Sequence, residues 1–503
     1  MILTNKSVSR PLSGSLNENM KYLQSLYEDC PDIIFREWFI FGTTAGVLIY
    51  NDGLANIEEI HENVLAPLME ELDSHQTDNP VETMKQKTRV AQMQEIQDFW
   101  DIIESVSTGQ PVVLIDGQNK GLSLGLGKWE KRGMEEPQAE SVIRGSREGF
   151  LESLSDNTAM LRRRIKSPSL KFKPFTIGRL TRTQVWVAYV EGIANPDLVR
   201  EAADRLRRIE TDDMLESGNI EELIKDDPYS PFPLLQSTER PDVVSSAILE
   251  GRIAILTEGT PFVLIAPTTL PSLLQSPEDY YQTFMFGTAI RWLRYLFMSI
   301  ALLGPSAYIA VASFHQEMIP SALFVTIARS REDIPFPVVV EGLIMELIFE
   351  AIREAGTRLP KQTGAAVSIV GALVIGEAAT SAGIVSFPMV MIVALSGIAS
   401  FMVPTYTTGI AIRMLRFPMM ILSGFLGLLG LILGILMTFA HLCKLRSFGV
   451  PYLTPVAPMI PGDLKDVAIK APYWMHDEHS DTKENTSNMR HEAGHIDKRR
   501  EDR

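Results

Sequence analysis

The stretch "FPMMILSGFLGLLGLILGILMTFAH", residues 417–441, contains no Asp, Glu, Lys or Arg. The hydrocarbon core of a bilayer is about 30 Å thick, which a helix of roughly 20 residues crosses. The stretch is therefore predicted to span a membrane. Two more runs lack these charged residues, 295–314 and 378–412. Together the runs predict an integral membrane protein whose spans we place at 293–314, 363–383, 385–404 and 417–441, with an interfacial segment at 315–333.

The residues before this half are charged, and a chain of 503 residues is expected to form at least two domains. The start, "MILTNKSVSRPLSGSLNENM", has no apolar core of a signal peptide. We therefore expect the N-terminal region to stay in the cytoplasm. Lys444 and Arg446 follow the last run and favour the same side for the C-terminus.

The N-terminal half alternates between strand-like and helix-like patterns, which predicts an α/β fold in two subdomains. Helices are expected at 90–106, 195–209 and 239–251, and strands at 111–117, 121–129, 185–192, 252–256 and 261–267. The fold class is thus an α/β cytoplasmic region followed by an α-helical transmembrane bundle. The expected regions are an N-terminal extension (1–85), two α/β subdomains (86–170 and 171–288, linked by an Arg-rich stretch within 128–172), a membrane domain (289–445) and a largely disordered cytoplasmic tail (446–503).

Several chemistries find no support in the residues. The net charge of −15 argues against a nucleic-acid partner, and two cysteines, Cys30 and Cys443, make no disulfide framework. "GLSLGLGK" fails the Walker A spacing, and "HEAGH" (491–495) lies in a hydrophilic tail without the apolar helix of a zinc protease. No catalytic set of side chains stands out. We predict no enzymatic activity, no cofactor and no metal site.

The segment "PFPVVVEGLIMELIFEAIREAGTRLP", residues 335–360, combines an apolar composition with carboxylates. On a helix, Glu346, Glu350 and Arg353 fall within about 60° of one another and form a polar stripe. Charges in lipid cost several kcal/mol each, so the stripe must face water, a partner or the membrane surface. Two interpretations stay open: a structural stripe, on an interfacial helix or in ion pairs, or the border of a water-filled path.

Glu377 is the one charged side chain between Lys361 and Arg413. A carboxylate within a predicted span is a candidate functional residue, facing a cavity or paired. The alternative is a neutral, hydrogen-bonded glutamic acid that joins two helices.

Several long blocks resemble the GerA family, the A-type subunits of bacterial spore germinant receptors. They are "YSPFPLLQSTERPDVVSSAILEGRIAILTEGTPFVLIAPTTLPSLLQSPEDYY" (229–281), "SFHQEMIPSALFVTIARSREDIPFPVVVEGLIMELIFEAIREAGTRLP" (313–360), "VGALVIGEAA" and "FGVPYLTP". The resemblance extends over roughly residues 85–460, and neither the first 85 residues nor the tail after 465 is matched.

The resemblance implies a location in the inner spore membrane, with the N-terminal domain and tail facing the spore core. It implies two partners, a transporter-like B subunit and a lipoprotein C subunit, and a homo-oligomer that conducts ions when nutrient binds. By the same route the span at 363–383 becomes the candidate lining of the ion path. Its candidate lining or gating residues are Ser368, Gly371, Ala372, Ile375, Gly376, Glu377 and Ala379. A structural scaffold of the receptor, or a small-solute transporter, is the alternative.

Overall fold

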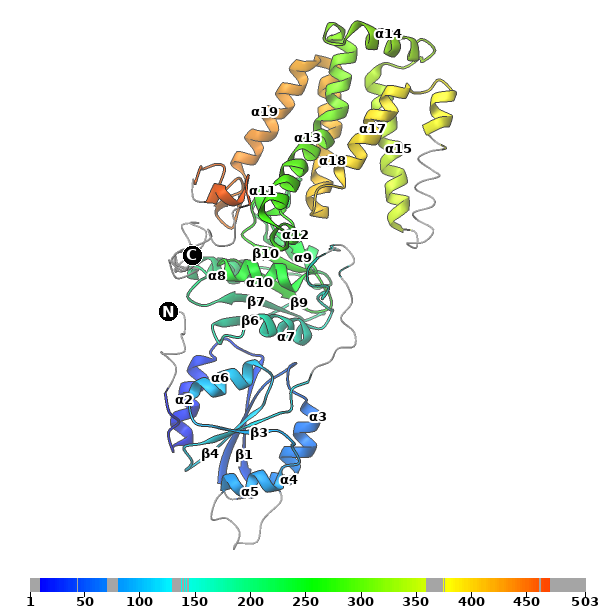
Figure 1. Cartoon of the computed structure of the whole chain (residues 1–503). Helices are drawn as coiled ribbons and strands as arrows, with labels where there is room; N and C mark the ends of the chain where they lie inside the picture. Colours follow the sequence, from blue (N-terminus) through cyan, green and yellow to red (C-terminus); the bar gives the residue numbers. More distant parts are fainter. Residues whose placement is uncertain are drawn as a thin grey trace, which may run out of the picture. The chain divides into compact units, whose positions relative to one another are not determined.

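The computed structural model describes residues 10–42, 44–69, 80–128, 137, 140, 142, 144–358, 374, 376–460 and 463–470 (Figure 1). These residues form two compact units. The first, here the α/β unit, contains the described residues up to 228 and residues 235–267. The second, here the helical unit, contains residues 229–234 and the described residues from 268 to 470.

The α/β unit begins with a lobe built on one antiparallel five-stranded sheet, in the order β1-β2-β4-β5-β3. We call residues 10–128 of the described chain the first lobe. Its strands are β1 (Ile33–Ile40), β2 (Thr44–Asn51), β3 (Met93–Ile96), β4 (Val112–Ile115) and β5 (Gly121–Leu124). Its helices are α2 (Leu16–Leu26), α3 (Ile57–Ile60), η1 (His61–Leu65), α4 (Ala66–Met69), α5 (Pro80–Lys87) and α6 (Phe99–Ser107).

Helices cover both faces of this sheet, so its central strands are apolar on both sides. Strand β4 shows the alternation: Val113 and Ile115 pack into the core under α3, η1, α4 and α5. Val112 and Leu114 pack into the core under α2 and α6. Successive side chains of a strand point to opposite faces, so a run of four apolar residues fills both cores. Figure 1 shows α2 and α6 on one side of the sheet and α3, α4 and α5 on the other.

The second lobe, residues 144–228 and 235–267, contains a second antiparallel five-stranded sheet in the order β6-β7-β9-β10-β8. Its strands are β6 (Leu170–Ile177), β7 (Thr183–Val190), β8 (Gln236–Thr238), β9 (Ile253–Thr257) and β10 (Val263–Ala266). Its helices are α7 (Leu154–Arg164), α8 (Pro196–Arg207), α9 (Ser217–Ile224) and α10 (Pro241–Leu249). Helices α7 and α10 share one core with the sheet.

The two lobes repeat one topology. Each has a helix, a strand hairpin, a helical connection, a short edge strand, a second helix and a final hairpin, and the strand orders correspond one to one. Small features repeat as well: Asn19 in α2 and Asn157 in α7 each bond the backbone N–H and C=O of the residue six positions earlier. Glycines with positive φ recur at matching turns, in the pairs Gly53 and Gly192, Gly109 and Gly251, and Gly117 and Gly259. The α/β unit is therefore an internal structural repeat.

The helical unit is a bundle with short connecting elements. Its helices are α11 (Leu270–Leu273), α12 (Pro277–Tyr281), α13 (Phe284–Phe314), η2 (Gln316–Met318), α14 (Ser321–Ser330), α15 (Val338–Arg358), a helical segment at 376–381, α17 (Phe387–Ser400), α18 (Tyr406–Leu426), α19 (Leu428–Lys444) and η3 (Asp463–Asp466). A two-stranded sheet, β11 (Arg446–Ser447) and β12 (Val450–Pro451), follows α19. Helix α13 packs along α17 and α18.

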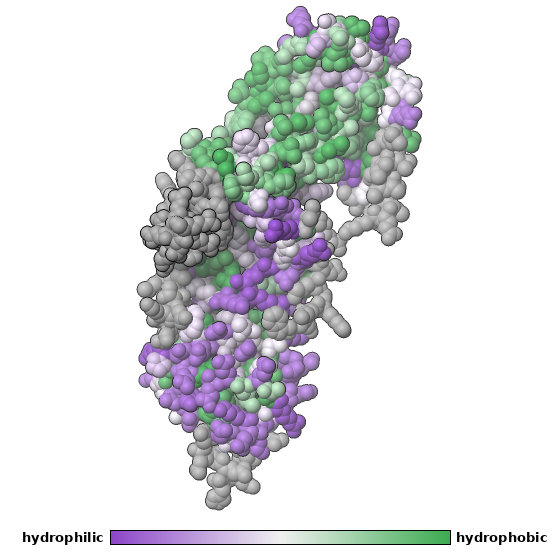
Figure 2. Space-filling model, in the orientation of Figure 1, coloured by the Kyte–Doolittle hydropathy of each residue, from purple (hydrophilic) through white to green (hydrophobic). Residues whose placement is uncertain are grey.

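Two helices of the described residues are long and apolar enough to cross a membrane, α13 and α18. Three shorter apolar helices, α14, α17 and α19, accompany them. The surface of the helical unit is mainly apolar in Figure 2, and the visible surface of the α/β unit is mainly hydrophilic. The exposed apolar side chains include Leu429, Leu433 and Leu436 of α19. An exposed apolar surface of this extent is typical of contact with lipid or with other subunits.

The predicted single span at 417–441 is wrong, because the helix breaks at Gly427. This residue has φ 62° and ψ −139°, a conformation that is open to glycine and costly for other residues. Helices α18 and α19 then fold back on one another, since Gly430 packs against Leu422 and Gly434 against Met419. The run is thus the end of one helix and most of the next in a tight hairpin.

Residues 463–470, here the C-terminal strap, return to the start of α13. Asp466 accepts hydrogen bonds from Arg291 Nη1 (3.0 Å) and Tyr280 Oη (2.6 Å). The carbonyl of Val467 accepts from Tyr295 (2.9 Å), and that of Ala468 accepts from Trp292 (2.6 Å). These side chains hold the strap mainly through its backbone.

The structure confirms the α/β class of the N-terminal half, with two sheets, and a helical C-terminal part. The strands expected at 111–117, 121–129 and 185–192, the hairpin of β9 and β10, and helices α8 and α10 are present.

Four expected boundaries differ from the structure. The separate extension over 1–85 is wrong, since β1 and β2 pair with β4 and belong to the first sheet. The helix expected over 90–106 is a strand at 93–96 followed by α6, which Asp98 caps. The linker within 128–172 contains α7 and the start of β6. The described part of the tail, 446–460 and 463–470, is ordered in the β11–β12 pair and the strap.

Candidate functional site

The helical unit contains a cluster of charges between α15 and α18. Nη1 of Arg416 donates to both carboxylate oxygens of Glu346, at 2.7 Å each. One turn further along α15, Glu350 lies 2.7 Å from Nε of Arg413. The side chains of Glu346 and Arg416 are 3% and 1% exposed. We call these four residues the charge ladder, because each pair joins the two helices like a rung.

Arg353 extends the charge ladder toward α17. Its guanidinium lies 3.1 Å from Glu350 and donates to Ser400 Oγ at 3.0 Å. The rings of Phe349 and Phe401 stack on it, with centroids at 4.8 and 5.1 Å. Arg353 is thereby held between its own helix and the end of α17.

The predicted polar stripe therefore faces neighbouring helices of the same chain. Glu346 is buried, and Glu350 and Arg353 are half-buried. Buried charges are strongly destabilising when unpaired, and pairing offsets much of that cost. In this chain each carboxylate of the stripe has an arginine within hydrogen-bond distance.

Arg413 and Arg416, the arginines of the charge ladder, were not among the predicted site residues. A signal was present: they are three residues apart in an otherwise uncharged stretch and so lie on one helix face. Opposite them α15 has Glu346 and Glu350, four residues apart. Matching charge spacing on two apolar helices indicates contact between the charged faces.

Glu341, in the first turn of α15, joins three segments. It is fully buried, and its carboxylate accepts from the N–H (2.9 Å) and Oγ (2.7 Å) of Ser386, the residue before α17. Arg331, just after α14, lies 3.1 Å from the other oxygen. The carboxylate thus caps α17 and pairs with the connection into α15.

The candidate lining residues are only partly within the described chain: Ser368, Gly371, Ala372 and Ile375 lie outside it. Gly376 is buried facing Val390 of α17, and Ala379 packs in the core between α13, α15 and α17. Glu377 is exposed. Of the three described candidates, Glu377 alone presents its side chain at the surface of the single chain. It lies six residues before Gly383, where an added Cβ would lie 3.4 Å from the carbonyl oxygen of Asp333 in the α14–α15 connection.

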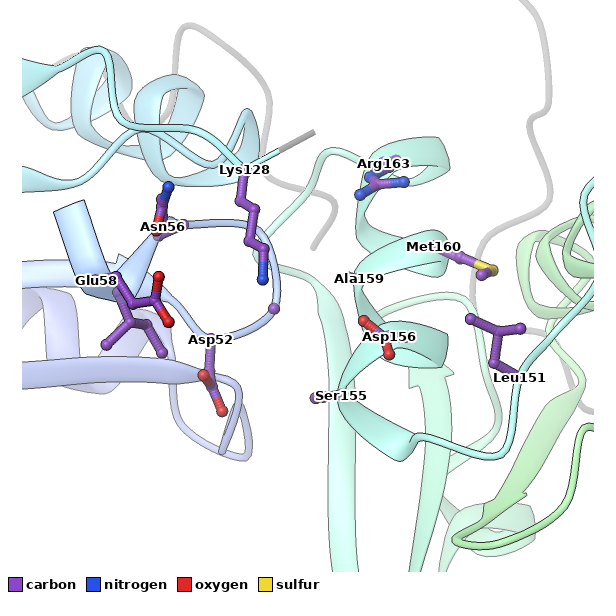
Figure 3. A pocket seen from close by; sticks show the side chains of 13 residues that line it. Asp52, Asn56, Glu58, Lys128, Leu151, Ser155, Asp156, Ala159, Met160 and Arg163 are labelled. Carbon is purple, nitrogen blue, oxygen red and sulfur yellow. The ribbon is translucent and has the colours of Figure 1, made fainter. Parts of the chain in front are cut away.

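The α/β unit contains a cavity of about 490 Å³ between its two lobes (Figure 3). The turn after β2 and the end of the first lobe line one side, and α7 lines the other. Its charged lining residues are Asp52, Glu58, Lys128, Asp156 and Arg163, and Met160 and Leu151 add apolar surface. A cavity with both signs of charge and an apolar patch suits a small polar or zwitterionic molecule. Among the described residues no group of His, Cys, Asp and Glu side chains is arranged to hold a metal ion.

A buried ion pair joins the lobes near this cavity. Asp32, which precedes β1, accepts from Nε (2.7 Å) and Nη2 (2.9 Å) of Arg162 in α7 and from Asn51 Nδ2 (3.0 Å). Gly53 lies against the carbonyl of Ser155, at a φ of +91°. The lobes therefore meet through a charged pair and a close backbone approach.

Comparisons with known proteins identify the family. Residues 21–482 match the model of the Bacillus/Clostridium GerA spore germination proteins. The chain belongs to the GerA family. The match begins at residue 21, so the expectation that the first 85 residues lie outside the resemblance is wrong.

The chain is similar to the uncharacterized membrane protein YfkQ of Bacillus subtilis, 47% identical over 92% of this chain and 90% of that protein. It is 44% identical to the spore germination protein KA of Bacillus subtilis, over 92% of this chain and 86% of that protein. Among solved structures it is similar to the N-terminal domain of the A subunit of the Bacillus megaterium spore germinant receptor GerK3. That likeness has 33% identity and a TM-score of 0.41, and it covers 52% of this chain and 97% of that chain.

Proposed function

We propose that this protein is the A subunit of a nutrient germinant receptor in the spore inner membrane and triggers germination as an oligomeric, nutrient-gated ion channel. Its membership of a spore germination family, matched over residues 21–482, supports this proposal. B and C subunits complete the receptor. The helical unit is embedded in the bilayer, with the α/β unit and the C-terminal strap on the side of the spore core.

Glu377 is the residue that most favours an ion path between copies of the chain. An exposed carboxylate on an apolar helical unit is costly against lipid, whereas a water-filled path shelters it. Gly376 and Ala379, on the buried side of the same segment, keep it closely packed on α17 and the core. In this proposal Glu377 faces the ion path, and Gly376 and Ala379 determine how close Glu377 lies to the axis of that path.

The test is ion release from vesicles that contain the chain with its B and C subunits. Vesicles loaded with K⁺ receive a rich nutrient mixture, and efflux is compared for the wild type, Glu377→Gln and Ala378→Ser. Ala378 is also exposed and serves as the matched control. A channel predicts triggered efflux that changes several-fold in Glu377→Gln and stays unchanged in Ala378→Ser. Efflux equal to that of vesicles without the chain would favour a scaffold, and flux that saturates with one solute would favour a transporter.

A second function is supported by the cavity between the lobes. We propose that the α/β unit binds a small polar molecule there, because the cavity joins both signs of charge with an apolar patch. Met160→Trp fills the cavity from α7. The full chain is mixed with each member of a panel of amino acids and sugars, and the rise in its thermal midpoint is measured. This rise is expected to disappear in Met160→Trp. It is expected to persist in Leu223→Trp, a change at an exposed position of α9. A panel that shifts neither the wild type nor the control would count against ligand binding.

A further inference from the structure

The second lobe differs from the first in where two of its segments pack. In the first lobe, Val90 precedes the edge strand β3 and Leu126 follows β5 by two residues, and both pack into a core of that lobe. In the second lobe, the corresponding segments, before the edge strand β8 and after β10, belong to the helical unit. They are residues 229–234, here the insert loop, and the residues from 268 onward. Because the lobes otherwise repeat one topology, this difference marks the two segments as specialised.

The insert loop is buried at the end of the bundle where α18 begins and α19 ends. Phe232 shares a core with Ala411 of α18 and Leu442 of α19. Ser230 Oγ lies 2.9 Å from Nε2 of His441, in the last turn of α19. A displacement of the insert loop therefore changes the packing of both helices.

One hydroxyl group joins both specialised segments to β11, the strand that follows α19. Ser447 Oγ donates a hydrogen bond to the carbonyl of Leu234 at 2.6 Å. The same oxygen accepts a hydrogen bond from the backbone N–H of Thr268 at 2.9 Å. All three residues are fully buried. We call Ser447, Leu234 and Thr268 the clip, because a single side chain holds two separate parts of the chain.

The chain between the clip and the second sheet is short. Leu234 lies two residues before β8, Thr268 lies two residues after β10, and β8 and β10 pair with each other. Leu235, the residue between Leu234 and β8, is buried. Parts of a chain that move independently are typically joined by exposed, polar linkers. A movement of β8 and β10 is therefore expected to move the clip.

The core of the second lobe connects these strands to the cavity between the lobes. Met160 of α7 lines the cavity and belongs to the same core as Val263 and Ile265 of β10. Protein cores are close-packed, so a shift of one member is transmitted to its neighbours. A continuous series of packed residues thus leads from the cavity through β10 to the clip.

We propose that the insert loop and the clip form the coupling element through which the second lobe regulates α18 and α19. A change in the second lobe, such as ligand entry into the cavity, moves β8 and β10, and the clip passes this movement to the end of α19. Ala411 lies two residues before Arg413, so the insert loop also acts on the helix that contains the arginines of the charge ladder. That the coupling regulates an ion path rests on the proposed function, whereas the coupling itself does not.

Hydrogen–deuterium exchange of the full chain in lipid nanodiscs measures this coupling without measuring ion passage. Ser447→Ala removes both hydrogen bonds of the clip. Loss of one net hydrogen bond corresponds to about a fivefold change in a local opening equilibrium. Amide exchange in β8 and β10 is therefore expected to rise at least about fivefold. Ser423→Ala is the matched control with no expected change in these strands, because Ser423 of α18 is equally buried and its hydroxyl has no partner among the described residues.

The reverse direction is tested from the core of the second lobe. Val263→Ala loosens that core and is expected to raise amide exchange at residues 441–445, the end of α19, several-fold. Val113→Ala, an equally buried valine of the first lobe, is expected to leave residues 441–445 unchanged. With Ser447→Ala already present, Val263→Ala is expected to have no further effect at the end of α19.

The inference fails if Ser447→Ala raises exchange only in residues 446–451 and leaves β8 and β10 as in the wild type. It also fails if Val263→Ala leaves residues 441–445 unchanged, or if Val113→Ala changes them equally. These two valine variants keep Ser447, so they decide the matter even if Ser447→Ala does not fold. A chain that shows the expected exchange but passes no ions would contradict the channel and still support the coupling.

Discussion

Replacing Arg162 by methionine is expected to destabilise the α/β unit strongly. The substitution keeps most of the side-chain volume but removes both charged hydrogen bonds to Asp32. Asp32 is 3% exposed, and Asn51 would remain as its side-chain donor. Breaking a buried pair by removing one partner costs about 3–5 kcal/mol, since the other charge stays buried without compensation. We therefore expect Arg162→Met to lower the free energy of unfolding by about 3–5 kcal/mol.

A matched double variant separates this cause from loss of packing. Replacing both members of a buried pair with apolar residues of similar size is close to neutral. Asp32→Leu with Arg162→Met is accordingly expected to be much more stable than Arg162→Met alone. The two effects are non-additive because the residues are in contact.

The assay is urea unfolding of the α/β unit within the full chain, followed by tryptophan fluorescence, to which Trp186, packed against the second core, contributes. With a typical dependence of about 2–3 kcal/mol per molar urea, Arg162→Met lowers the midpoint by about 1–2 M. A loss below about 1 kcal/mol, or a double variant that costs the sum of the single changes, would refute the reasoning.

Three further predictions concern other parts of the molecule. Gly53→Ala is expected to lower the thermal midpoint of the α/β unit more than Gly259→Ala, because both have positive φ but an added Cβ meets the α7 backbone at 2.9 Å only at Gly53. Burial raises the pKa of Glu140 to about 7. The folded state then holds the proton more tightly than the unfolded state, so the free energy of unfolding falls as pH rises from about 4.5 to 7. Glu140→Gln does not titrate. It is therefore expected to be more stable than the wild type by about 3 kcal/mol above pH 7 and equal to it near pH 4. Gly427→Ala is expected to cost about 1–3 kcal/mol in the heat stability of the detergent-solubilised chain, while Gly304→Ala, whose added Cβ meets a single side chain at 3.7 Å, is neutral.

Patterns of composition that extend over about 20 residues were predictable from the sequence, whereas the break of a helix at a single residue was not. The uncharged runs located the helical unit because apolar composition over 20 residues is a strong signal. The same uniformity hid the turn at Gly427, since glycines are frequent in this run and only the backbone conformation distinguishes one of them. Strand β1 was missed because Arg36 and Glu37 lie in its middle, which an edge strand tolerates where these side chains reach solvent.

The charged groups show a similar division. The stripe of Glu346, Glu350 and Arg353 could be found on one helix by spacing alone. Its partners Arg413 and Arg416 lie on another helix, so finding them requires a comparison of the charge spacing on the two helices as well as the pattern on one of them. The cavity between the lobes was also beyond prediction, because it forms only where two separately folded sheets meet.

The C-terminal strap brings the chain that follows the last helix of the bundle, α19, back to the start of its first long helix, α13. Removing residues after 470 is expected to leave α13 supported. A stop codon before 463 takes away the Asp466 carboxylate that Arg291 holds and the carbonyls that Trp292 and Tyr295 hold. A label or fusion partner added to this protein therefore belongs beyond residue 470. The same arrangement means that tension applied to the distal end of the chain reaches the first helix of the bundle without passing through the others.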